Sequence, residues 1–143
     1  ENLGRINRWC GDHGVDFTGH YLGEESPGAE IWHQGAAASV RKQMSIPGMD
    51  VLYDTSVEPT PSCTYSTFVH HYDNLDLTGK LVASAAGCTG SRRTFAEAYG
   101  GFPYWGSPAD LTAQTHWTTA QGINLINDNS LSVSWKSFRK RTL

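Results

Sequence analysis

The hydrophobic residues of this chain follow two patterns along the sequence, one typical of helices and one typical of strands. Apolar residues at helical spacing, followed by glycine or proline, predict four helices. Short apolar runs between them predict four strands. The predicted helices cover residues 2–13, 36–44, 78–86 and 108–120, and the predicted strands cover residues 15–20, 49–53, 93–98 and 123–127.

Two helix starts carry recognisable capping residues. Ser107 supplies an N-cap hydroxyl, Pro108 suits the first helical position, and Asp110 places an acid in the first turn. Thr78 is expected to cap the third helix in the same way. These signals predict where the last two helices begin.

Three polar segments interrupt the pattern. Residues 23–28 and 54–65 are rich in Gly, Pro and polar side chains and are predicted to be loops. Residues 66–76 fit neither period and are left unassigned. We interpret residues 55–76 as a loop or insertion within a single domain that spans residues 1–143.

Alternating strands and helices predict a parallel sheet and an α/β fold. Such alternation suits half of an eight-stranded barrel and also a doubly wound sheet. No GxGxxG or phosphate loop follows a strand, which disfavours a nucleotide-binding sheet. Polar residues follow every predicted strand, and in a barrel these ends converge on one mouth. They are His20 with Glu24, Asp54, Glu97 and Asn127. We therefore predict the second half of a (β/α)₈ barrel, with about four parallel strands.

Composition narrows the function classes. The chain has 143 residues, a formal net charge of −3 and 11 scattered Lys and Arg residues. This predicts a single domain and no nucleic-acid partner. No apolar run is long enough to cross a membrane, so no membrane partner is expected either. The three cysteines show no metal-ligand spacing and are interpreted as incidental thiols.

The acidic residues suggest one particular chemistry. Hydrolysis of a glycosidic bond needs two carboxyl groups, one to give a proton and one to attack the sugar or activate water. The candidates are Glu97, at the end of a predicted strand, and one of Glu24 or Glu25. The alternatives for Glu97 are a salt bridge to Arg92 or Arg93, or simple surface exposure.

Other side chains near these acids suit a sugar site. His20 is interpreted either as a functional residue, which hydrogen-bonds a sugar hydroxyl or tunes a neighbouring carboxylate, or as a structural histidine. Trp32 and Trp105 offer rings for a pocket wall and for stacking on a sugar, although aromatic rings also fill cores. No cofactor is expected. Oxygen ligands for calcium exist at Glu24, Asp54 and Asp128, without a supporting spacing, so a divalent cation such as calcium stays an open alternative.

Several short segments, taken in order, carry a family likeness. They are Trp9-Cys10 through His13-Gly14, Phe17-Thr18-Gly19-His20 with Glu24, Gln34-Gly35, Ile46-Pro47-Gly48-Met49-Asp50, Lys80 with Ser84-Ala85-Ala86, Glu97-Ala98-Tyr99-Gly100, Trp117, Gly122-Ile123-Asn124 and Arg139-Lys140-Arg141. Each motif is short, and their order is what counts. In this order they resemble large bacterial glycoside hydrolases of the α-L-rhamnosidase type and related barrel enzymes.

The resemblance implies the C-terminal half of a (β/α)₈ barrel with Glu97 and Glu24 as the catalytic pair. Glu24 is preferred to Glu25 because it takes the position after His20 that the family pattern marks. The resemblance also implies that His20 and Asn124 shape the sugar site. The full predicted substrate-binding set is His20, Glu25, Trp32, Tyr99, Trp105, Asn124 and Asn127. One departure is Asn127-Asp128-Asn129 where related sequences carry Asn-Pro-His, so a histidine that can contact substrate is missing.

The implied partner is a plant or microbial polysaccharide or oligosaccharide. The resemblance also implies that the parent protein is secreted or periplasmic. This chain would then be a fragment that lacks the N-terminal half of the barrel and accessory β domains, and it need not be active alone. Two alternatives stay open. One is a degenerate barrel that binds carbohydrate without cutting it, and the other is an unrelated α/β enzyme acting on a phosphorylated small molecule.

Overall fold

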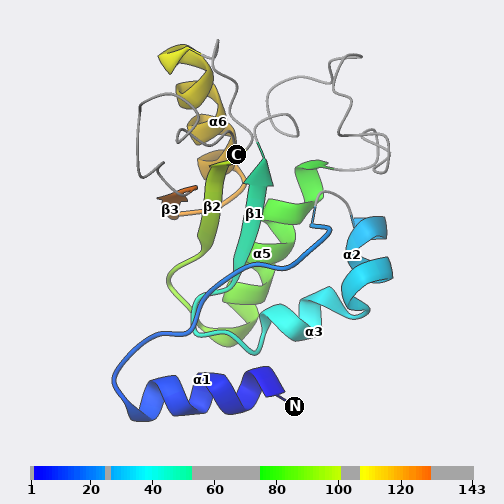
Figure 1. Cartoon of the computed structure of the whole chain (residues 1–143), viewed down its shortest axis with the longest axis vertical. Coiled ribbons are helices and arrows are strands. Elements are labelled where there is room, and N and C mark those ends of the chain that lie inside the picture. Colours follow the sequence, from blue (N-terminus) through cyan, green and yellow to red (C-terminus); the bar gives the residue numbers. More distant parts are fainter. Residues whose placement is uncertain (1, 25–26, 53–74, 101–106, 130–143) are drawn as a thin grey trace, which may run out of the picture.

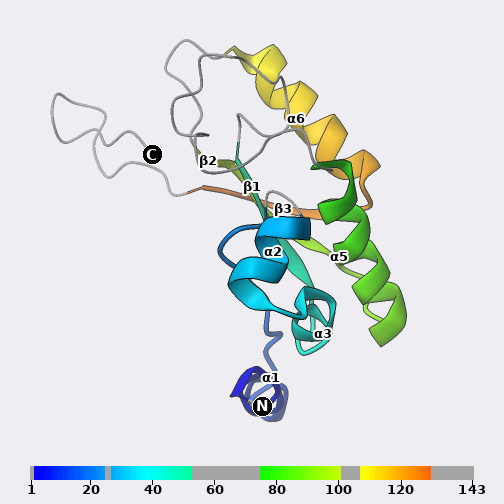
Figure 2. The ribbon, with the colours of Figure 1, turned by 90° about the vertical axis from the view of Figure 1, so that its right-hand side faces the viewer.

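The computed structural model describes residues 2–24, 27–52, 75–100 and 107–129 (Figure 1). Within these ranges, helices and strands alternate along most of the chain. In order they are α1 (Asn2–Asp12), α2 (Pro27–Gln34), α3 (Ala37–Arg41), β1 (Gly48–Leu52), α5 (Leu75–Thr89), β2 (Phe95–Gly100), α6 (Pro108–Ala120) and β3 (Leu125–Asp128). Helix α1 lies apart from the sheet, beyond the end where the strands begin (Figures 1 and 2).

The three strands form one parallel sheet in the order β1-β2-β3. Neighbours in the sheet are therefore also neighbours in sequence, with α5 connecting β1 to β2 and α6 connecting β2 to β3. The predicted α/β class and the parallel sheet are confirmed at this level.

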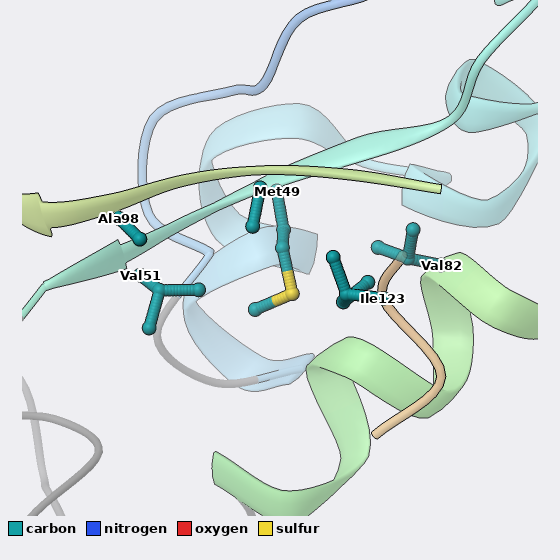
Figure 3. Close-up of a cluster of buried hydrophobic side chains, with 6 residues drawn as sticks. Met49, Val51, Val82, Ala98 and Ile123 are labelled. Atoms are coloured by element: carbon teal, nitrogen blue, oxygen red, sulfur yellow. The ribbon is translucent and has the colours of Figure 1, made fainter. Parts of the chain in front are cut away.

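Helices α5 and α6 lie on the same side of the sheet (Figure 2), and the hydrophobic core fills the space between. Alternate strand residues point to that side because side chains alternate along a strand. The buried core consists of Met49 and Val51 of β1, Ala96 and Ala98 of β2, Val82 of α5, and Ile123 (Figure 3). Trp117 of α6 packs against this cluster, as its position in the middle of a helix predicts.

The remaining strand residues face away from α5 and α6. Asp50 lies between Met49 and Val51, so its side chain projects to the opposite face of β1. Strand pairing sets Asp50 opposite Glu97, and Glu97 opposite Asn127. A row of three polar residues therefore crosses the sheet on the face that α5 and α6 leave uncovered.

The predicted first strand, residues 15–20, is wrong as a strand. The structure has only an isolated parallel bridge between Thr18 and Ile46, with the Phe17 carbonyl accepting from the Ile46 N–H. This segment still runs beside the start of β1. Gly48 allows that approach, since a β-carbon there would come within 2.2 Å of the Gly19 carbonyl oxygen. The contact brings His20 next to the sheet without a full strand.

Other boundaries also differ from the prediction. Strand β2 is Phe95–Gly100 instead of residues 93–98, so Glu97 lies inside the strand and not at its end. The predicted loop at residues 23–28 overlaps the start of α2, because Pro27 suits the first turn of a helix. Helix α3 ends at Arg41 instead of residue 44. Thr78 lies inside α5, which begins three residues earlier, and its hydroxyl donates to the Glu24 carbonyl instead of capping the helix. Its side chain therefore satisfies a contact between segments far apart in sequence.

The start of α6 matches its prediction closely. The Ser107 hydroxyl accepts from the Asp110 N–H, the Asp110 carboxylate accepts from the Ser107 N–H, and Pro108 occupies the first turn. Apart from Leu75 and Asp76, which begin α5, the predicted loop or insertion at 55–76 lies outside the described residues.

Candidate functional site

Glu97 is held at both carboxylate oxygens. His20 Nε2 donates to Oε2 at 2.9 Å, and Asn129 Nδ2 donates to Oε1 at 2.8 Å. The Glu97 side chain is 26% exposed. It projects from the middle strand of the sheet, so solvent reaches a carboxylate whose orientation is fixed by two donors.

His20 lies between two carboxylates. Its Nδ1 is 3.9 Å from Glu24 Oε2, while its Nε2 bonds to Glu97. Burial alone lowers the pKa of His20, but the Asp50 charge, the hydrogen bond to Glu97 and the charges of Glu24 and Glu97 together raise it above its usual value. The protonated ring, which donates from both nitrogens, suits this position.

Glu24 lies on the other side of the His20 ring from Glu97, in a buried environment. Its side chain is 1% exposed, Oε1 accepts from Arg41 Nη2 at 2.9 Å, and Oε2 accepts from the Asp50 N–H at 2.7 Å. Arg41 Nη2 also donates to Glu30, so one buried guanidinium serves two buried carboxylates. Burial raises the pKa of Glu24 to about 7, although Arg41 and backbone N–H groups oppose that rise.

The two acids predicted as a catalytic pair are therefore brought together, with a histidine between them. His20 Nδ1 lies 3.9 Å from Glu24 and its Nε2 lies 2.9 Å from Glu97, so a single imidazole ring separates the two carboxylates. In this arrangement Glu97 faces the accessible side and Glu24 contacts it through His20.

Asp50 is a member of the group that the sequence reasoning did not single out. It is half-buried, pairs in register with Glu97 on the neighbouring strand, and raises the pKa of His20 by its charge. The available signal was a single acid in an otherwise apolar buried strand, Gly48–Leu52. A charge in that position usually has a partner or a function.

Asn129 was also missed as a site residue. Its backbone N–H donates to the Ala98 carbonyl at 2.8 Å, which extends the pairing of β3 with β2 by one residue. Its side chain then reaches Glu97. The sequence signal was the departure Asn127-Asp128-Asn129, interpreted there only as the loss of a histidine.

Two residues of the predicted substrate-binding set make contacts elsewhere. The side chain of Asn124 joins the beginnings of β2 and β3, accepting from the Thr94 N–H and donating to the Arg92 carbonyl, each at 2.9 Å. These contacts lie where β2 and β3 begin, whereas Glu97 is the third residue of β2. Tyr99 has a positive φ of 68° beside a register shift in β2, and its hydroxyl meets Thr115 of α6 at 2.6 Å. The local backbone thus turns this ring toward the helices.

The other predicted binding residues are distributed as follows. Asn127 is exposed and lies beside Glu97 in register, with its Nδ2 donating to the Asp128 carbonyl. Trp32 is on α2 with 86% of its surface exposed, as an accessible ring requires. Glu25 and Trp105 lie outside the described residues.

Two searches of the described part of the chain gave negative results. There, no cluster of three or more His, Cys, Asp or Glu side chains has an arrangement that holds a metal ion. Among those same residues, no helix combines the length and apolarity of a membrane span.

The fold and site define a mixed α/β protein that carries a polar group on one face of a short parallel sheet. Compared with known proteins, the chain matches no family model, no curated protein and no solved structure.

Proposed function

We propose that this chain belongs to a glycoside hydrolase and contributes the second half of its (β/α)₈ barrel. Three parallel strands in chain order, with α5 and α6 on one face, are the arrangement that a barrel segment requires. The row of Asp50, Glu97 and Asn127 would then face the barrel interior, from which side chains reach toward the mouth where such enzymes keep their chemistry.

The observation that carries this proposal is the Glu97 carboxylate. It is partly exposed, and His20 and Asn129 fix it by one hydrogen bond to each oxygen. A fixed, ionised carboxylate is the group that attacks the anomeric carbon or activates water in glycoside hydrolysis. We assign this role to Glu97, acting on a plant or microbial polysaccharide or oligosaccharide.

The proton donor of the reaction is Glu24 or Asp50. A pKa of about 7 gives Glu24 a proton in a large share of molecules at neutral pH, as a general acid needs. Its carboxylate, however, lies behind His20 and binds Arg41. Asp50 lies on the same face of the sheet as Glu97 and pairs with it in register on the neighbouring strand. Side chains paired in this way are close together. Comparison of Glu24→Gln with Asp50→Asn separates the two assignments.

The same burial of Glu24 favours a second candidate function. If Arg41 keeps Glu24 from the substrate and Asp50 does not replace it, the site has one reacting carboxylate and binds sugar without cutting it. Sugar binding with no turnover would support this binding protein. Turnover that depends on two carboxylates would exclude it.

A panel of aryl glycosides and plant oligosaccharides tests the proposal. The protein is expected to release product from at least one substrate, and Glu97→Gln is expected to abolish that release. Asp12→Asn is the matched control, because Asp12 is an exposed acid at the end of α1 and undergoes the same chemical change. Release that survives Glu97→Gln would contradict the assignment.

A further inference from the structure

We infer that Asn129 is a positioning residue that, together with His20, orients the Glu97 carboxylate as the ionised member of the reacting pair. This inference rests on the proposed function for its catalytic meaning. Its structural basis stands on the contacts of three side chains from separate segments of the chain.

The first argument is the pattern of donors. Each oxygen of Glu97 accepts one hydrogen bond, Oε2 from His20 and Oε1 from Asn129. An ionised carboxylate only accepts, whereas a protonated carboxyl group must donate from one oxygen. Two donors directed at two different oxygens therefore fit the ionised form and fix the plane of the carboxylate.

The second argument is that the backbone itself fixes Asn129. Its N–H donates to the Ala98 carbonyl, one residue beyond Glu97 in β2. Side chains alternate along an extended chain, so Asn129 lies on the same face as Asn127 and projects toward Glu97. The amide is thus held in place by the sheet, and its short side chain has little freedom to lose when it bonds.

The third argument concerns the kind of donor that Asn129 supplies. Its side-chain amide N–H bonds to Glu97. An asparagine supplies this donor at every pH, whereas an imidazole changes its donors as it titrates.

The test uses the 143-residue chain with carboxyl ¹³C labels on Glu and Asp. The Glu97 signal is identified by its absence in Glu97→Gln. Asn129→Leu removes the donor while keeping the shape, and the Glu97 carboxyl signal is expected to titrate at a higher pH than in the wild type, because the charged form loses a hydrogen bond. Asn129→Asp, which sets a second carboxylate against Glu97, is expected to raise this titration midpoint at least as far. Asn129→His restores a donor and is expected to return the midpoint most of the way.

Asp110 provides the internal control in every sample. Its pKa is lowered by hydrogen bonds from Ser107, so an unchanged Asp110 signal shows that α6 and its cap are intact. If one variant fails to fold, the other two still compare the presence and absence of the donor. A Glu97 midpoint that is the same in the wild type, Asn129→Leu and Asn129→Asp would overturn the inference.

Kinetics separates this inference from the proposed function. If a glycoside is cleaved, Asn129→Leu is expected to lower kcat about 10-fold to 100-fold with little change in KM, and to move the acidic limb of the pH profile upward. A shifted midpoint without turnover of any glycoside supports the role of Asn129 and counts against the proposed function. Turnover with an unshifted midpoint supports the function and overturns the role of Asn129.

Discussion

Glu24 and Glu97 belong to two adjacent clusters built from the same residue types in different surroundings. Glu24 is 1% exposed and bonds to Arg41, which is fully buried and also bonds to Glu30. Glu97 is 26% exposed and bonds to His20 and Asn129. His20 lies between the two carboxylates and belongs to both clusters.

The two acids differ in burial: Glu24 is enclosed in the protein, whereas Glu97 is accessible to solvent. A buried carboxylate needs a permanent cation, because leaving water costs several kcal/mol for each ion. Arg41 supplies that cation, and its contacts tie α2, α3 and the start of β1 together. A partly exposed carboxylate tolerates a weaker cation, because solvent reaches it. The buried cluster thereby supports the accessible one.

Arg41→Met removes the buried cation of the Glu24 cluster and is expected to have the largest effect on stability. It leaves Glu24 and Glu30 buried without their shared cation, so the free energy of unfolding should fall by about 3–5 kcal/mol. Lys42→Met is the control, since Lys42 is exposed and adjacent, and it should change stability by at most about 0.5 kcal/mol. Urea denaturation measures both, and equal losses in the two variants would show that the buried cluster is not structural.

The pH dependence of stability is the next largest effect. Glu24 has a folded pKa of about 7 against an ordinary value of 4.5, so the folded state binds more protons than the unfolded state between these pH values. Stability should therefore decrease as pH rises through this window, by on the order of 2–3 kcal/mol. The raised pKa of His20 acts in the same direction.

Glu24→Gln is the variant that isolates this effect. Urea denaturation between pH 5 and 8 should show a flatter profile for Glu24→Gln than for the wild type, while Glu97→Gln should keep most of the slope. If Glu24→Gln and the wild type have the same slope, the raised pKa of Glu24 is wrong.

The smallest expected effect is a change in the pKa of His20, the residue that lies between Glu24 and Glu97. Its pKa is raised by Asp50, Glu97 and Glu24 against the lowering effect of burial. Asp50→Asn and Glu97→Gln are each expected to lower the pKa of His20, measured by the ring proton shifts in NMR spectra, because each removes a negative charge that favours the protonated ring. The signal of His116, exposed on α6, should not move in these variants. An unchanged His20 pKa in both variants would show that the charges of Asp50 and Glu97 do not act on the His20 ring.

Local signals predicted the elements that depend on nearby residues. Ser107 and Asp110 form the capping box that fixes the start of α6, and both partners lie within four residues of each other. The alternation of apolar runs likewise predicted the parallel α/β class. The predicted strand at 15–20 is wrong, because its apolar residues fit a strand while only Thr18 pairs with the sheet.

The candidate site was only partly predictable because its contacts span the chain. Glu97 and His20 were selected as polar residues at predicted strand ends, and the structure joins them across 77 positions. Asp50 and Asn129 were missed because strand register decides what faces Glu97. The cation for Glu24 comes from Arg41 on a separate helix, and no local pattern marks that pairing.

The most direct test of the central claim is the turnover of Glu97→Gln beside that of Glu24→Gln, on any glycoside that the protein cleaves. Rates are compared per folded molecule, with circular dichroism measuring the folded fraction. We predict that Glu97→Gln stays folded and that its kcat falls roughly 10³-fold or more, because the reacting carboxylate is removed. A folded Glu97→Gln variant with the wild-type rate would contradict the assignment of Glu97 as the reacting carboxylate.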